Sequence, residues 1–189
     1  MNTLNTFRFI TLGILAGGRA ARLGGSDKAW ALYRGETLIE RTLLAVGDAF
    51  ATRLVSANRK IDRYAALGLR VVIDRAADFP GPLAGLDALL AICATPLLLT
   101  VPVDLLAIPH DLVARLHAAG EGGAVAQDAS GLQPLIALWP VERARIAVAQ
   151  ALAGGERAAH RVVAQLDLPV VHFEGADFGN LNTPDDFLA

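Results

Sequence analysis

Residues 11–28 read TLGILAGGRAARLGGSDK, an apolar run that leads directly into a loop rich in glycine and positive charge. Glycine lets a ligand approach backbone N–H groups closely, and arginine and lysine attract phosphate. The first glycine pair, Gly17 and Gly18, is followed by Arg22, and a second pair is followed by Lys28. This spacing predicts a cradle for several phosphates in series, although a surface loop with solvated charges would show similar glycine turns. The loop matches neither the Walker phosphate loop nor G-x-G-x-x-G.

Beyond this loop, short apolar runs alternate with segments of helical periodicity. We expect strands over residues 8–15, 52–57, 70–74, 97–102, 123–127, 132–139 and 169–174. We expect helices over residues 37–50, 60–68, 82–94, 109–120 and 141–155. Such alternation predicts an α/β fold whose mainly parallel sheet is covered by helices on both faces.

Polar residues follow the ends of the predicted strands. After the first four strands come, in order, residues 17–28, Asn58, Asp74 and Asp104. Ligands of parallel sheets bind beyond the carboxyl ends of the strands. The sequence therefore predicts that these residues line one edge of the sheet and face a ligand there.

Asp104 closes the apolar run LLLTVPVD at residues 97–104. A carboxylate in that place needs solvent, an ionic partner or a metal. Mg²⁺ usually takes one or two carboxylates together with substrate phosphate oxygens, which favours a metal role beside the predicted phosphate loop. The alternative is an N-cap of the helix near Pro109, but that helix start lies several residues further along the chain.

Near the end of the chain, GNLNTPDDF at residues 179–187 places Asn180 and Asn182 one residue apart. The Thr-Pro-Asp-Asp that follows resembles a helix start with a capping box. Capping leaves the paired asparagines without a role. Because amide side chains both donate and accept, we interpret these two as candidates for recognising a pterin or base edge.

Charge and cysteine content narrow the class of protein. The net charge is −2, from 17 basic and 19 acidic residues, and no basic run is present to bind nucleic acid. The one cysteine, Cys93, lies in an apolar segment and is expected to be a buried, inert thiol. The apolar run near the N-terminus is too short for a membrane span and lacks the features of a secretory signal. We expect a cytoplasmic protein that binds neither nucleic acid nor membrane.

Together these motifs resemble the molybdenum cofactor guanylyltransferases, the MobA-like branch of the nucleotidyltransferases. The loop of that family has the form LAGGxxxRMGGxDK, and residues 15–28 read LAGGRAARLGGSDK, with Leu23 in place of the usual methionine. The similarity continues through GETLIERTL (35–43), SAN (56–58), ID…DFPGPLAG (73–85), PVD (102–104) and NLNTPDDF (180–187). The second glycine pair with Asp27 resembles the guanylyl branch more than the cytidylyl branch.

The resemblance implies a three-layer, Rossmann-like nucleotidyltransferase fold with a mainly parallel, mixed sheet. The length of the chain suits one domain over residues 1–189. The small, polar stretch at 117–131 separates a nucleotide-binding front half at about 7–120 from an acceptor-binding back half at about 121–189. The implied reaction transfers GMP from GTP to the terminal phosphate of molybdopterin, with or without molybdenum. Its products are molybdopterin guanine dinucleotide and pyrophosphate, and its implied cofactor is Mg²⁺. Other cofactor-biosynthesis proteins, or chaperones of the molybdoenzymes, are expected as further partners.

The resemblance also assigns residues to the nucleotide. It implies that Leu15, Ala16 and Gly17 contact the guanosine nucleotide through their backbone. It further implies that Asn58 and Asp74 help to seat the nucleoside.

Three residues carry the implied chemistry. Arg22 and Lys28 would hold the phosphates, and Asp104 would bind Mg²⁺ opposite the nucleotide. Attack of one phosphate on another needs positioning and charge neutralisation more than a protein nucleophile, so the lack of a Ser, Cys or His nucleophile motif is expected. Arg157 is a further candidate, as a contact to the pterin phosphate.

Two departures from the family pattern lie on the acceptor side. Leu105 and Leu106 stand where the family often has Thr-Pro, and residues 133–135 read Gln-Pro-Leu where it often has His-Pro-Thr. These departures leave open one alternative, a guanine-nucleotide-binding accessory protein without catalytic activity. Two enzymatic alternatives of nearby chemistry also stay open: a cytidylyltransferase for the same cofactor and a sugar-phosphate nucleotidyltransferase.

Overall fold

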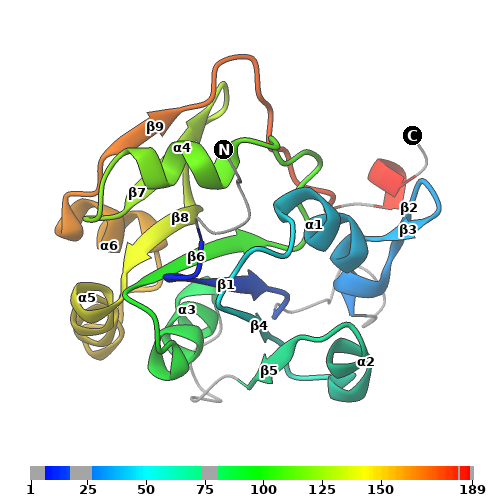
Figure 1. Cartoon of the computed structure of the whole chain (residues 1–189), viewed down its shortest axis with the longest axis horizontal. Helices are drawn as coiled ribbons and strands as arrows, with labels where there is room; N and C mark the ends of the chain where they lie inside the picture. The colour runs from blue at the N-terminus through cyan, green and yellow to red at the C-terminus, as the bar shows by residue number, and fades with distance from the viewer. Residues whose placement is uncertain (1–6, 18–26, 74–80, 183, 188–189) are drawn as a thin grey trace.

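The computed structural model describes residues 7–17, 27–73, 81–182 and 184–187. Its main sheet has seven strands in the order β5-β4-β1-β6-β8-β7-β9 (Figure 1). The strands are β1 (Ile10–Leu15), β4 (Thr52–Ser56), β5 (Arg70–Val72), β6 (Leu97–Pro102), β7 (Ala124–Asp128), β8 (Gly131–Pro140) and β9 (Val170–His172). Each of these strands was predicted from the sequence: β6 has the predicted bounds, and the bounds of the others differ by one or two residues.

The pairing of the strands confirms the mainly parallel, mixed sheet. Strands β5, β4, β1 and β6 are parallel to one another, whereas β8 pairs antiparallel with both β6 and β7. The last strand, β9, is parallel to β7. Strand β8 therefore runs against its neighbours, and the other strands share one direction.

Helices cover both faces of the sheet, as predicted. They are α1 (Leu38–Val46), α2 (Ile61–Ala66), α3 (Pro82–Ile92), α4 (Leu112–Ala118), α5 (Val141–Ala153) and α6 (Ala159–Leu166). Buried residues of α1, α2 and α4 belong to one hydrophobic cluster, and those of α3, α5 and α6 belong to a second. The sheet lies between these two clusters, which gives the three layers of the predicted α/β fold.

Some helix boundaries differ from the prediction for local reasons. The helix predicted from residue 109 begins at Leu112, whose N–H donates to the carbonyl of Pro109 at 3.0 Å. The helix predicted to reach residue 50 ends at Val46, because Gly47 takes a φ of 76°. Helix α6 was not predicted. It has only eight residues and follows a glycine-rich turn, so the sequence shows its apolar pattern over little more than two helical turns.

The structure also contains a small β-hairpin that the sequence did not predict, β2 (Leu32–Tyr33) paired with β3 (Glu36–Thr37). The short 3-10 helix η4 (Pro184–Phe187) lies beside this hairpin near the end of the chain (Figure 1). The ring of Phe187 contacts that of Tyr33 edge-on, with centroids 6.4 Å apart. The end of the chain is thereby fixed next to the segment that follows the glycine loop.

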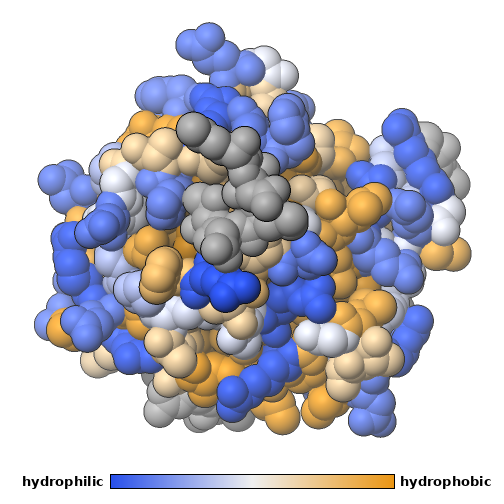
Figure 2. Space-filling view, viewed as in Figure 1, coloured by the Kyte–Doolittle hydropathy of each residue, from blue (hydrophilic) through white to orange (hydrophobic). Residues whose placement is uncertain are grey.

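The burial of the one cysteine agrees with the sequence. Cys93 is a buried free thiol, 3% exposed, as predicted. On the face shown in Figure 2, hydrophilic residues occupy much of the outline, and hydrophobic residues form smaller areas between them. In the described part of the chain, no helix has the combined length and apolar character that a membrane span requires.

Gly123 gives a direct test of this packing. It precedes β7 with a φ of +84°, and a Cβ at this position would lie 2.3 Å from the carbonyl oxygen of Leu138. We expect Gly123→Ala to lower the free energy of unfolding by roughly 3 kcal/mol, through backbone strain and overpacking together. In thermal unfolding that loss corresponds to about 6–12 °C.

The matched control is Gly122→Ala, because a Cβ at Gly122 would meet no atom within 4 Å. We expect this variant to unfold within about 2 °C of the parent chain. Equal losses in the two variants would contradict the described approach of Gly123 to β8.

Candidate active site

The carboxyl ends of the parallel strands meet at one edge of the sheet, and backbone hydrogen bonds continue just beyond them. The N–H of Ala16 donates to the carbonyl of Ser56 at 3.1 Å, and the N–H of Val103 donates to the carbonyl of Leu15 at 3.1 Å. The loops after β1, β4 and β6 are therefore joined side by side. Of the residues predicted to line this edge, Leu15, Ala16, Gly17, Lys28, Asn58 and Asp104 are described. Gly18, Arg22 and Asp74 lie outside the described residues.

Three predicted residues from distant parts of the chain meet at this edge. The ammonium nitrogen of Lys28 donates to Oδ2 of Asp104 at 2.7 Å and to the side-chain oxygen of Asn182 at 2.8 Å. The Lys28 and Asp104 side chains are only 19% and 24% exposed, so their ion pair is partly shielded from solvent. We call these three residues the charged triad.

Local structure fixes where Lys28 starts. Lys28 is the first residue of the 3-10 helix η3 (Lys28–Trp30), and Asp27 is its N-cap. One carboxylate oxygen of Asp27 accepts the N–H of Ala29 at 3.2 Å. The other accepts the hydroxyl of Tyr64 on α2 at 2.9 Å. Asp27 therefore joins the lysine turn to α2.

Aromatic stacking reinforces that join. The ring of Trp30 packs against the ring of Tyr64 with centroids 4.9 Å apart, and the guanidinium of Arg63 lies 3.8 Å from the centroid of the Trp30 ring. Burial, with the neighbouring Asp27 carboxylate, raises the pKa of the Tyr64 hydroxyl far above its usual value. The hydroxyl stays protonated and serves as a donor. No motif in the sequence pointed to Tyr64.

Asp104 is held by the backbone on two sides. It follows β6, and its own carbonyl accepts the N–H of Leu181 at 2.8 Å. The adjacent Leu105 forms an antiparallel bridge with Asn180. The N-cap of α4 is Asp111, so the structure does not give Asp104 the alternative capping role.

The two asparagines have different surroundings. Asn182 contributes its side-chain oxygen to Lys28, and its N–H donates to Asp186 at 2.6 Å. Asn180 is exposed and pairs through its backbone with Leu105. Thr183, the predicted helix cap, lies outside the described residues. The structure therefore places the Asn182 side chain against Lys28, whereas Asn180 pairs through its backbone with Leu105.

The residues that depart from the family pattern, Leu105, Leu106 and Gln133, contact other parts of the chain. Leu105 is buried, and the carbonyl of Leu106 accepts a hydrogen bond from Arg41 at 3.1 Å. Gln133 on β8 directs its amide at Asp128, at 3.0 Å. Both departures thus have structural partners within the chain.

Asp128 at the end of β7 was missed by the sequence analysis. Burial by itself would raise the pKa of this carboxyl, but hydrogen bonds from Ser130, Phe178 and Gln133 outweigh burial and lower the pKa below its usual value. Asp128 is therefore ionised at neutral pH although it is only 7% exposed.

Arg157 lies in the turn between α5 and α6. Because β8 runs against β6, α5 begins at the amino edge of the sheet. Glu156 accepts the N–H groups of Arg157 and Ala158, both at 2.8 Å, and the Arg157 side chain is exposed. Glu156 thereby orders the start of this turn through two backbone hydrogen bonds.

The donor set has the chemistry of a site for a hard cation. Two oxygens, one from Asp104 and one from Asn182, converge on a single cation, the Lys28 ammonium. Within the described ranges, no group of three or more His, Cys, Asp or Glu side chains is placed to hold a metal ion. One carboxylate fits Mg²⁺ when the ligand's own phosphate oxygens complete the coordination.

Solved structures share this fold. Molybdopterin-guanine dinucleotide biosynthesis protein A from Archaeoglobus fulgidus superposes with a TM-score of 0.71 at 21% identity, covering 94% of this chain and 95% of that one. A 2-C-methyl-D-erythritol 4-phosphate cytidylyltransferase from Thermus thermophilus superposes with a TM-score of 0.69 at 22% identity, covering 93% and 94%. These likenesses confirm the three-layer nucleotidyltransferase fold.

Sequence comparison is more specific. The model of the MobA-like NTP transferase domain matches residues 12–170. A molybdenum cofactor guanylyltransferase from Cupriavidus taiwanensis is 36% identical in an alignment of 190 positions that covers 93% of each chain. The resemblance read from the motifs is therefore confirmed across nearly the whole chain, and the chain belongs to the MobA-like NTP transferase family.

Proposed function

We propose that this nucleotidyltransferase is a molybdenum cofactor guanylyltransferase, which transfers GMP from GTP to the terminal phosphate of molybdopterin and releases pyrophosphate. The observation that carries the proposal is the charged triad, where Lys28, Asp104 and Asn182 meet at the carboxyl edge of the sheet. Ligands of such sheets bind at this edge. The curated relative with 36% identity carries the same activity in its name.

The reaction needs a protein that positions the two substrates and supplies positive charge near their phosphates. An oxygen of the molybdopterin phosphate attacks the α-phosphorus of GTP, and the bond from that phosphorus to the bridging oxygen of pyrophosphate breaks. Lys28 binds the phosphates, and its partly shielded position strengthens the attraction relative to an exposed lysine. Arg22, outside the described residues, is proposed as the second cation of the phosphate loop.

Asp104 and the phosphate oxygens of GTP are proposed to hold the metal, Mg²⁺. When bound, this ion supplies charge that stabilises the pentavalent transition state and the leaving pyrophosphate. In the structure Lys28 neutralises Asp104. This ion pair directs the Asp104 carboxylate into the site, and Asn182 provides a second acceptor for the Lys28 ammonium.

The remaining residues are proposed to contact the nucleoside and the acceptor. The backbone of Leu15, Ala16 and Gly17 and the side chain of Asn58 are proposed to contact the guanosine. Arg157 is proposed to contact the acceptor phosphate. The triad joins residues of the front half, 7–120, to Asn182 of the back half, 121–189, which supports one domain with a shared site.

The direct test is transfer itself. With Mg²⁺ and molybdopterin, we expect the purified chain to release pyrophosphate from GTP with a kcat/KM about a hundredfold above that with CTP or ATP. Equal or better use of CTP would contradict the guanylyl assignment, since the fold is shared with a cytidylyltransferase. Binding of GTP without release of pyrophosphate would instead favour the accessory protein.

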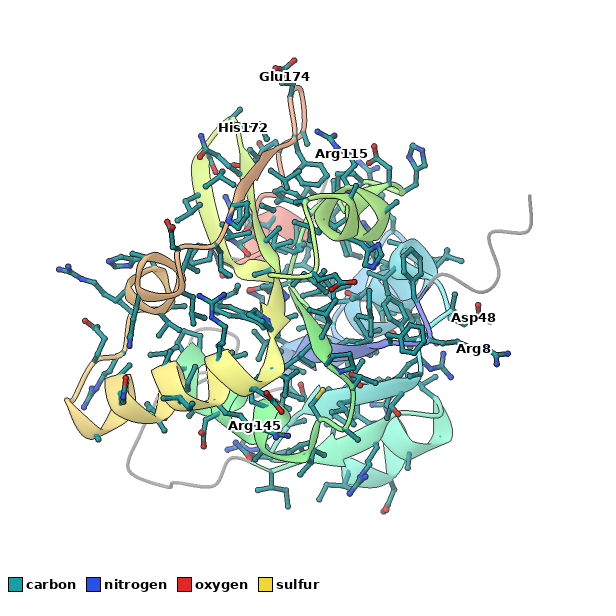
Figure 3. All side chains as sticks on the ribbon, turned by 60° about the vertical axis from the view of Figure 1, so that its left-hand side comes forward. Arg8, Asp48, Arg115, Arg145, His172 and Glu174 are labelled. Carbon is teal, nitrogen blue, oxygen red and sulfur yellow. The ribbon has the colours of Figure 1, made fainter. Side chains whose placement is uncertain are left out.

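A second prediction concerns the metal. Asp104→Asn keeps the size of the side chain but removes its charge, so metal-dependent transfer should fall by about a hundredfold or more. Raising the Mg²⁺ concentration should not restore it. The matched control is Asp48→Asn, an exposed carboxylate just before β4, at the amino edge (Figure 3). The control should retain parental activity, and a parental rate in Asp104→Asn would end the metal assignment.

A further inference from the structure

The segment that returns from β9 to the charged triad is anchored at its start. We define residues 173–182 as the C-terminal strap. The N–H of Phe173 donates to the carbonyl of Gln127 at 2.7 Å. Arg115 of α4 donates to the carbonyl of His172, and its guanidinium lies 4.2 Å from the centroid of the Phe173 ring. Figure 3 shows Arg115 facing this end of β9, with Glu174 at the outer tip of the turn that follows.

The middle of the strap is held by Asp128. Among the described residues, Asp128 is the only buried carboxylate. One of its oxygens, Oδ2, accepts the N–H of Phe178 at 2.8 Å. The other, Oδ1, accepts the N–H and hydroxyl of Ser130 at 2.9 and 2.7 Å and the amide of Gln133 at 3.0 Å. The carboxylate therefore joins the tip of the β7–β8 hairpin to the strap.

The far end of the strap supports the charged triad. The carbonyl of Phe178 accepts the N–H groups of Leu106 and Ala107 at 2.8 and 3.2 Å. The N–H of Leu181 then donates to the carbonyl of Asp104. Leu181 directly precedes Asn182, whose side chain accepts a hydrogen bond from Lys28. The strap backbone, held by these hydrogen bonds, thus links Asp128 to two members of the triad.

The chemistry of this position requires a carboxylate. Donors approach both oxygens of Asp128. An asparagine has one acceptor oxygen and one NH₂ group, so it can satisfy the Phe178 side or the Ser130 side but not both. Gln133, which departs from the family pattern, fits this arrangement because its side-chain amide donates one of the hydrogen bonds to Asp128.

We propose that Asp128 is a positioning residue for the transfer reaction: by fixing the strap at Phe178, it sets the place of Asn182 and of the Asp104 backbone around Lys28. Asp128 touches no substrate in this account and acts through the strap. The activity part of the proposal rests on the proposed function, whereas the ordering of the strap does not.

The test compares Asp128→Asn with Ser130→Ala, Asn182→Ala and the double variant Asp128→Asn/Asn182→Ala. The matched control is Thr11→Val, which removes a buried hydrogen bond to Thr95, 2.8 Å long, at the start of β1. Three quantities are measured: the hydrogen-exchange rates of backbone amides 178–182, the thermal midpoint, and kcat/KM for GMP transfer.

We expect Asp128→Asn to speed exchange of the Phe178 and Leu181 amides by about tenfold or more and to lower kcat/KM by about tenfold, as for loss of a hydrogen bond to a charged group. Ser130→Ala should change both quantities in the same direction by a smaller factor. Thr11→Val should lower the thermal midpoint but leave strap exchange and kcat/KM at parental values. The double variant should lose less in kcat/KM than the product of the two single losses, because Asp128 acts in part through Asn182.

Two results would overturn the proposal. One is parental exchange of amides 178–182 in both Asp128→Asn and the milder Ser130→Ala. The other is a double variant whose loss in kcat/KM is the product of the two single losses, since independent effects multiply. A parental chain that transfers no GMP would refute the proposed function, and the exchange rates would still decide whether Asp128 orders the strap.

Discussion

The ion pair between Lys28 and Asp104 is the contact on which the site depends. It joins the turn after the glycine loop to the end of β6, and Asn182 adds a third segment from the end of the chain. Because the pair is partly shielded, a misplaced partner would leave a poorly solvated charge. The fold must therefore hold three loops in register at one edge of the sheet.

Two carboxylates on different elements, Asp27 and Asp128, hold these loops in place. Asp27 and Tyr64 attach the lysine turn to α2, and Asp128 attaches the strap to the β7–β8 hairpin. In both, a carboxylate accepts hydrogen bonds from two segments at once, which fixes direction as well as distance. The side chains that would handle phosphate are thus placed by residues that do not face it, as precise sites generally require.

The sequence predicted much of this arrangement because strand ends follow from hydrophobic runs. The alternation of strands and helices placed Lys28 and Asp104 at one sheet edge, and the glycine loop supplied the phosphate chemistry. Tyr64 and Asp128 escaped prediction because their partners are set by tertiary structure. Asp128 reaches Phe178 only when β8 runs antiparallel between β6 and β7, and that order cannot be read from local periodicity. Helix α6 was missed because eight residues show too little of its period.

We propose that the Lys28 ammonium, set between Asp104 and Asn182, anchors the phosphates of the nucleotide. Calorimetric titration of Lys28→Met with GTP and with guanosine, each in the presence of Mg²⁺, tests this role. The affinity for GTP should fall by about tenfold or more, as for loss of a charge-assisted hydrogen bond, while the affinity for guanosine stays at the parental value. Equal losses for the two ligands would contradict the claim.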